Sequence, residues 1–114
     1  MLSSSVRIKK GDFDKLKKEK SRSFSTDNFT LKIFQSNSNT SCFAVVVSSK
    51  TSKKAVDRNK IKRHVKNIIS VNLKKIRSGM SVIIYTKKNS LKTPFRDIEI
   101  DLLGLFKKAN ILND

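Results

Sequence analysis

The sequence predicts an α+β fold, in which a small mixed sheet of four strands packs with three helices in the order α-β-β-β-α-β-α. Three observations support this prediction. Apolar residues recur at helical spacing in residues 57–77 and again from residue 93 onward. A length of 114 residues suits a single domain, 1–114, with one modest core. Four short segments have the composition or alternation of strands: 20–25, 29–35, 42–49 and 81–86.

The first helix and the first two strands come from the N-terminal part of the chain. Asp12 is a suitable N-cap for a short helix that contains Phe13, Leu16 and Lys17. The first strand, 20–25, is short and mostly polar. Side chains alternate between the two faces of the second strand, 29–35. One face carries Phe29, Leu31 and Ile33, and the other face carries Thr30, Lys32 and Phe34.

The third strand follows a polar loop at residues 36–41, whose side chains readily bond their own backbone. This strand, 42–49, is apolar on both faces and rich in β-branched residues, a pattern typical of a central strand. We therefore expect 29–35 and 42–49 to pair as a hairpin.

The two longer helices are needed to cover the sheet. The first is expected to end at Ser78-Gly79, since glycine commonly follows a helix. Its apolar stripe consists of Ile61, Val65, Ile68, Ile69, Leu73 and Ile76. In the last helix, Thr93 is the expected N-cap and Pro94 the first helical residue. Its apolar stripe consists of Phe95, Ile98, Leu102, Leu105, Phe106 and Ala109.

The charge balance is strongly basic. Lysine and arginine number 26 against 9 aspartate and glutamate residues, so the formal net charge is +17. Such self-repulsion calls for a polyanionic partner, and nucleic acid is the usual one. The longest apolar run, 42–47, is far too short to cross a bilayer, so we expect no membrane partner. Cys42 is the only cysteine, which excludes an intrachain disulfide and favours a cytoplasmic location.

The basic residues are densest around the start of the long helix, where eight cations accompany a single acid, Asp57. At 100° per residue, Arg58, Lys62 and Lys66 form a ridge beside the apolar stripe. Arg58 falls where a core residue is expected, so we predict that the first turn overhangs the sheet and that Arg58, Asn59 and Lys62 line a concave space there. A merely solvated charged face is the alternative, but the near absence of acids favours phosphate binding.

The segment 55–63, AVDRNKIKR, resembles the signature of the bacterial ribonuclease P protein component, which runs Ala-Val-x-Arg-Asn-x-x-Lys-Arg. The resemblance extends to Arg7-Ile-Lys-Lys, Asp12-Phe13, Ser49-Lys50 and Leu105-Phe106-Lys-Lys. It implies a left-handed βαβ crossover, against the general rule of right-handed ones. It also implies the role of an accessory protein subunit of ribonuclease P, the endoribonuclease whose RNA performs the hydrolysis that forms mature tRNA 5′ ends.

The same resemblance implies partners and site residues. The chain is expected to bind the catalytic RNA subunit and the 5′ leader of precursor tRNA, with Mg²⁺ held mainly by RNA and no obligate protein partner. We expect no catalytic residue and no metal site formed by the polypeptide alone. The leader-binding cleft would include Phe13, Lys17 and Lys32. The residues expected on the catalytic RNA are Lys50, Lys53, Lys54, Arg58, Asn59, Lys60, Lys62, Arg63 and Lys66.

Four lysines depart from the family pattern. Lys60 stands where a second arginine is usual, and Lys53 where a glycine is usual. Lys17 and Lys32 stand where cleft aromatics are usual. The leader would therefore be bound more by charge than by stacking of its bases.

Other residues give weaker signals, and two other functions stay open. His64 is the lone histidine and cannot form a metal cluster by itself. Asp97, Glu99 and Asp101 lie on different faces of the last helix and more simply complement its dipole. A general RNA-binding or ribosomal protein of similar fold is the second hypothesis. A DNA-binding regulator ranks last, because the second half of the basic helix is too apolar to lie in a groove.

Overall fold

The computed structural model describes residues 8, 20–35, 41–47 and 50–112. Its fold class is α+β, as predicted. The expected first helix, with Phe13, Leu16 and Lys17, lies outside the described residues, so the described part has two α-helices where three were predicted for the whole chain. The described elements are β1 (Arg22–Ser25), β2 (Phe29–Gln35), β3 (Cys42–Val46), α2 (Ala55–Val71), η2 (Leu73–Lys75), β4 (Met80–Thr86), η3 (Lys88–Lys92) and α3 (Phe95–Lys108), where η marks a 3₁₀ segment.

The four strands form one mixed sheet in the order β1-β2-β4-β3. β2 is antiparallel to both β1 and β4, whereas β3 runs parallel to β4. The predicted mixed sheet is confirmed, but the predicted hairpin between 29–35 and 42–49 is wrong, because β4 lies between these strands. Among the described strands, β3 lies at the edge of the sheet and β4 is central.

The apolar character of β3 has a different cause from the one inferred from its sequence. One face of β3, with Phe43 and Val45, packs into the main core, and the other contributes Ala44 and Val46 to a second, smaller cluster. Its outer edge accepts a hydrogen bond from the backbone N–H of Ile8 to the Phe43 carbonyl, at 2.9 Å. A strand can thus be apolar on both faces and still lie at the edge of a sheet.

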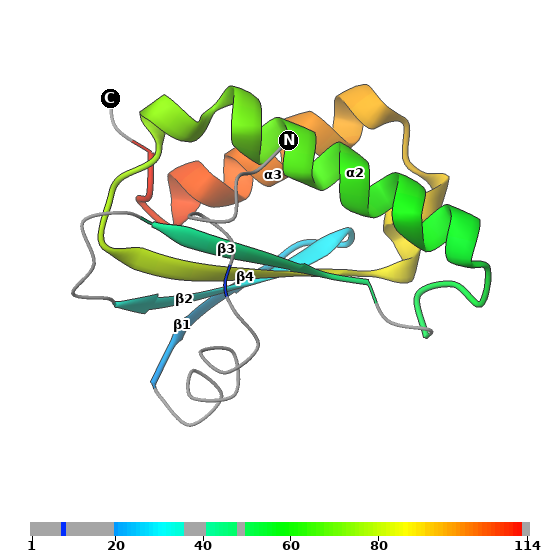
Figure 1. The fold of residues 1–114 in the computed structure, drawn as a ribbon, viewed down its shortest axis with the longest axis horizontal. Coiled ribbons are helices and arrows are strands. Elements are labelled where there is room, and N and C mark those ends of the chain that lie inside the picture. The colour runs from blue at the N-terminus through cyan, green and yellow to red at the C-terminus, as the bar shows by residue number, and fades with distance from the viewer. Residues whose placement is uncertain (1–7, 9–19, 36–40, 48–49, 113–114) are drawn as a thin grey trace.

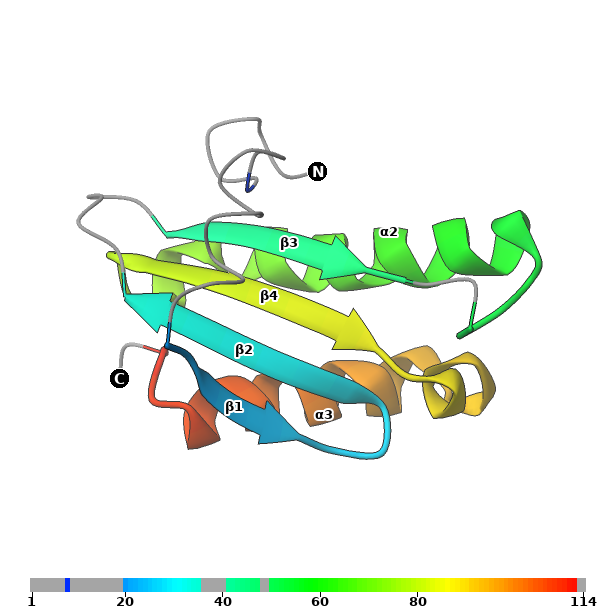
Figure 2. The ribbon, with the colours of Figure 1, turned by 90° about the horizontal axis from the view of Figure 1, so that it is seen from below.

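Both α-helices pack on the same face of the sheet (Figure 1). α2 contacts β3, and α3 contacts β1. In Figure 2 the sheet is in front of the helices, β3 and β4 run in the same direction, and α2 passes behind them. In this view β4 lies below β3, both strands run to the right, and the helix that connects them is behind the sheet. The β3-α2-β4 connection is therefore left-handed, which is rare for parallel crossovers.

The main core lies between the sheet and the two helices. It receives Leu31 and Ile33 from β2, as the alternation in 29–35 predicted. The predicted helical stripes are buried along α2 and α3 with two exceptions. Leu73 is half-buried and lies in η2, and Phe95, the first residue of α3, is 39% exposed. The buried stripe residues within the helices are Ile61, Val65, Ile68 and Ile69 on α2, and Ile98, Leu102, Leu105 and Phe106 on α3.

α2 ends at Val71, well before the predicted end at residue 77. The Asn72 side chain donates from Nδ2 to the Ile68 carbonyl at 2.8 Å, and its backbone N–H reaches the same carbonyl at 3.2 Å. These bonds satisfy a carbonyl at the helix end. Ile76 then leaves the helical path and forms an isolated bridge with Leu112, so its helical spacing was misleading.

α3 begins at Phe95, one residue later than predicted, and the expected Thr93 cap is absent. The Thr93 hydroxyl instead lies 3.0 Å from Oδ1 of the buried Asn28. The same oxygen accepts a bond from Asn89 Nδ2 at 2.8 Å, and Asn28 Nδ2 donates to Asp101 Oδ2 at 3.1 Å. This network fastens η3 and the start of α3 to the turn between β1 and β2.

Replacement of Phe106 by alanine should lower the free energy of unfolding by about 3–5 kcal/mol, because the ring is fully buried and leaves a cavity. Urea denaturation followed by circular dichroism measures this change. Ile100→Ala on the same helix is the control, since Ile100 is 63% exposed and its loss should change stability by less than about 0.5 kcal/mol. Equal losses in both variants would contradict the described packing of α3.

Candidate nucleic-acid interface

The first turns of α2 extend beyond the end of the sheet (Figures 1 and 2). Residues 55–60 include no buried side chain, and the buried stripe starts at Ile61. The predicted overhang is therefore confirmed. It leaves the start of the helix accessible on several faces.

Arg58 lies at the start of α2, in the part of the helix that overhangs the sheet. Its Nη1 donates to the Ser52 carbonyl at 2.7 Å, and the side chain is half-buried. The Ser52 hydroxyl also bonds with Asp57 Oδ2 at 3.4 Å and accepts from the Lys54 backbone N–H at 3.2 Å. The guanidinium thus holds the loop that enters α2, because the overhanging turn brings that loop within its reach.

A second contact pins the same loop to the sheet. Thr51 is buried, and its hydroxyl donates to the Thr86 carbonyl at the end of β4, at 3.1 Å. Lys50, Lys53 and Lys54 flank this anchor and are exposed. Sequence reasoning named these lysines but missed Thr51 and Ser52, whose small polar side chains give little signal in a single sequence.

Four of the predicted RNA-contacting residues lie together along the outer side of α2. Asn59, Lys62, Arg63 and Lys66 line one open depression, which Val56 extends toward the start of the helix. Asn59, Lys62 and Arg63 are exposed, and Lys66 is half-buried. The helical repeat produces this grouping, since positions three and four apart share a face. The arrangement offers an amide and three cations to a polyanion.

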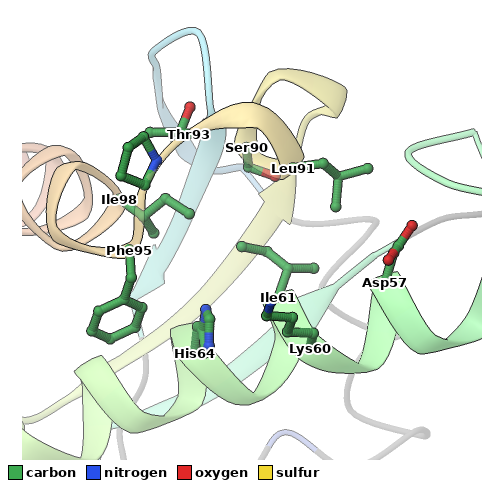
Figure 3. Close-up of a pocket in the computed structure, with 10 residues that line it drawn as sticks. Asp57, Lys60, Ile61, His64, Ser90, Leu91, Thr93, Phe95 and Ile98 are labelled. Carbon is green, nitrogen blue, oxygen red and sulfur yellow. The ribbon is translucent and has the colours of Figure 1, made fainter.

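Lys60 lies apart from that group, on the flank of α2 that faces α3. It lines a pocket of about 340 Å³ between α2, η3 and the start of α3 (Figure 3). The pocket floor and rim include Ile61, Leu91 and Phe95. The His64 ring meets the Phe95 ring edge-on, with centroids 4.5 Å apart. No pattern in the sequence pointed to this pocket, because it joins segments about thirty positions apart.

The pKa of His64 is lowered from its usual value of 6.5. Burial beside the pocket is the largest cause, because desolvation disfavours the charged ring. The positive charges of Lys60 and Arg63 lower the pKa further. The ring is therefore neutral at pH 7 and retains one nitrogen as a hydrogen-bond acceptor.

The face of the sheet opposite α2 and α3 carries the one described residue of the predicted leader cleft, Lys32. Lys32 is half-buried, and its Nζ lies 5.6 Å from the ring centroid of Tyr85 on β4. Phe34 and Ile83 are buried on this same face. Phe13 and Lys17, the other predicted cleft residues, lie outside the described residues.

The acids of α3 do not form a paired-carboxylate site. Asp101 accepts hydrogen bonds from Thr26 at 2.7 Å and from Asn28, so its role in the described structure is to join α3 to the β1–β2 turn. Among the described residues, no group of three histidine, cysteine or acidic side chains is placed to hold a metal ion. Within the same ranges, neither helix is long and apolar enough to span a membrane.

The family model and the similar proteins all identify the same family. The family model described as Ribonuclease P matches residues 2–110. The ribonuclease P protein component of Clostridium botulinum (strain Loch Maree / Type A3) is 33% identical over 93 residues, which are 81% of this chain and 83% of that protein. That of Finegoldia magna is 27% identical over 110 residues, which are 96% of this chain and 95% of the relative.

Solved structures agree with these sequence matches. The RNase P protein of Staphylococcus aureus superposes with a TM-score of 0.84 at 25% identity, covering 95% of this chain and 98% of that one. The RNase P protein from Thermotoga maritima gives a TM-score of 0.80 at 27% identity, covering 90% and 96%. The four-stranded mixed sheet is thus the fold of these proteins too.

NMR titration of the His64 ring should give a pKa below 6.5, and this is the chain's only histidine, so its signal is unambiguous. Lys60→Ala and Arg63→Ala should each raise that pKa, because each removes a repulsive charge. Lys74→Ala, an exposed change on η2, is the control and should leave it unchanged. An unshifted pKa in both test variants would contradict the described charge environment.

The same shift has a consequence for stability. Between the folded pKa and 6.5 the unfolded chain binds more protons at His64 than the folded chain does. The contribution of His64 to the free energy of unfolding is therefore complete above pH 6.5 and is lost as the pH falls through the folded pKa. Denaturation curves of wild type and His64→Gln across this range measure it, and a slope of opposite sign would refute the assignment.

Proposed function

The chain belongs to the Ribonuclease P family, as an accessory protein component of that tRNA-processing endoribonuclease, and we propose that α2 and the loop before it bind the catalytic RNA. The observation that carries the residue assignment is the grouping of Asn59, Lys62, Arg63 and Lys66 along one side of a helix that overhangs the sheet. In this proposal the RNA performs the hydrolysis and the polypeptide supplies binding.

The proposed contacts are mainly to phosphates. Lys62, Arg63 and Lys66 are spaced along about one turn of helix, so they offer charges at successive positions to one stretch of backbone. The loop lysines Lys50, Lys53 and Lys54 extend the positive surface around the start of α2. The Asn59 amide can donate to a phosphate or accept from a ribose hydroxyl.

In this proposal Arg58 both holds the loop before α2 and contacts the catalytic RNA. One guanidinium nitrogen holds the Ser52 carbonyl, which sets the shape of the loop that carries the lysines. Arginine has five N–H donors, so the remaining ones can reach the catalytic RNA. Loss of Arg58 should therefore disturb both the loop and the contact, which makes Lys62 the cleaner residue for a binding test.

The proposed mechanism is electrostatic. Cations on α2 offset the repulsion between the phosphates of two RNA molecules, so fewer free Mg²⁺ ions should be needed to bring substrate and catalytic RNA together. The α2 surface itself does not fit a Mg²⁺ site, because this ion prefers carboxylate and other oxygen ligands, whereas lysine and arginine repel it. Mg²⁺ in the assembled enzyme is accordingly assigned to RNA.

We place the 5′ leader of precursor tRNA on the face of the sheet opposite α2 and α3, where Phe13 and Lys17 are expected to join Lys32. Tyr85 is the aromatic beside Lys32 there, and the ammonium group already lies near its ring. This pair supports a cleft in which the Lys32 ammonium group attracts a phosphate and the Tyr85 ring can stack on a base. Cytoplasmic location and independence of other protein partners belong to the same proposal, supported by the single cysteine and the basic composition.

Reconstitution tests the function. Purified protein with its cognate catalytic RNA should cleave a leader-bearing precursor tRNA at lower Mg²⁺ than the RNA alone, because protein cations replace part of the ionic atmosphere. The protein alone should cleave nothing. Affinity of the assembled particle for leader-bearing and mature tRNA is then compared. Equal affinity for both would reject the leader assignment, and cleavage by the isolated protein would reject the accessory role.

Lys62→Ala should weaken binding to the catalytic RNA by about 1 kcal/mol and reduce the slope of log affinity against log salt by about 1, as expected for one lost phosphate contact. Lys107→Ala is the matched control, because Lys107 is also an exposed lysine and lies near the end of α3. Filter binding at several salt concentrations gives both quantities. An unchanged slope in Lys62→Ala would show that this lysine does not touch the RNA.

A further inference from the structure

We propose that the pocket between α2, η3 and the start of α3 holds one unpaired nucleobase of the RNA that α2 binds. This inference rests on the proposed function, since it takes α2 to be an RNA-binding element. It adds a second contact on the flank of α2 that faces α3. Contacts along the outer side of α2 are to phosphates, whereas this pocket would hold the base itself.

The shape of the pocket suits a small planar ligand. Its volume of about 340 Å³ lies at the lower end of the range of small-molecule sites. The buried side chains of Ile61 and Ile98 line it, and so do the side chains of Leu91 and Phe95 (Figure 3). Leu91 is 37% exposed and Phe95 39% exposed, so both present apolar surface to whatever enters. Exposed apolar surface gathered around a pocket is typical of a binding site.

The aromatic content points to a base. The Phe95 ring is held by the edge-on contact of His64, which leaves part of its surface exposed. RNA-binding proteins stack unpaired bases on such rings, and each stacked base contributes substantially to affinity. The His64 ring is neutral at pH 7, so it offers one donor and one acceptor to the edge of a base.

The charges around the pocket favour a nucleotide over an uncharged aromatic compound. Lys60 lines the pocket, and Arg63 is close enough for its charge to lower the pKa of His64. A phosphate near these two cations would be attracted, whereas Asp57, also on the pocket wall, would repel it. The nucleotide is thereby oriented, with its phosphate toward Lys60 and an amino group of its base able to donate to Asp57.

Hydrogen bonds hold the wall of the pocket formed by η3 and the start of α3. Thr93, which lines it, hydrogen-bonds with the buried Asn28, and Asn28 is held in turn by Asp101 and Asn89. Ser90, also on the wall, is 1% exposed, and its hydroxyl donates to the Lys87 carbonyl at 2.7 Å. A wall that is already ordered before binding loses little conformational entropy, so the pocket can bind a base without folding around it.

A variant series tests the role of the ring. Phe95→Leu keeps an apolar side chain but removes the stacking surface, and it should weaken binding to the cognate catalytic RNA about 5- to 100-fold. Phe95→Tyr keeps the ring and should bind like wild type. Ile100→Leu, an exposed change on the same helix, is the matched control. Thermal melting of each free protein shows whether the fold is retained, and only folded variants are compared.

Photo-crosslinking locates the base directly. The protein with p-benzoylphenylalanine in place of Phe95 is assembled with the catalytic RNA and irradiated. Crosslinking to one unpaired nucleotide is expected, and the same probe in place of Ile100 should not mark that nucleotide. Wild-type affinity in Phe95→Leu would overturn the pocket proposal, and so would the absence of a distinct crosslink from position 95.

The two proposals fail differently. If Lys62→Ala weakens RNA binding and Phe95→Leu does not, α2 binds RNA and the pocket does not hold a base. If the wild-type protein fails to bind the catalytic RNA, the proposed function itself is rejected, and the base-binding inference falls with it.

Discussion

The aliphatic contact between α2 and the sheet is the interaction on which the rest of this structure depends. Ile61, Val65, Ile68 and Ile69 are all buried against the sheet, with at most 4% of each side chain exposed. Each such burial contributes about 1.5–3 kcal/mol, whereas repulsion between exposed charges is screened by salt over about 8 Å. A helix that carries this many cations is therefore held in a fixed place without any need for acidic partners.

Only one side of α2 packs on the sheet, so two other surfaces of the helix are available for binding. The outer side carries Asn59 and Arg63, and the flank toward α3 carries Lys60 and His64. These residues are interleaved in sequence, and only the helical repeat separates them into two surfaces. One helix can thus offer charges to a phosphate backbone on one side and an aromatic pocket on the other.

The surrounding elements set the position of these surfaces. Thr51 ties the loop before α2 to the end of β4, and Arg58 closes the same loop from the helix side. Asn28, in the turn between β1 and β2, fastens Thr93 and so fixes the start of α3 opposite α2. Small polar side chains far apart in sequence therefore determine the geometry of a site whose charges come from a single segment.

The sequence by itself determined the local features: the alternation in 29–35, the buried stripes of both helices, the overhang of α2 and the family motif at 55–63. These depend on the 2- and 3.6-residue periods of the backbone, which a single sequence displays directly. Only the tertiary structure decided that β4 separates β2 from β3, that α2 stops at Val71, and that Phe95 meets His64. The physical reason is that strand pairing, helix ends and pockets depend on contacts between distant segments, and periodicity carries no information about which segments meet.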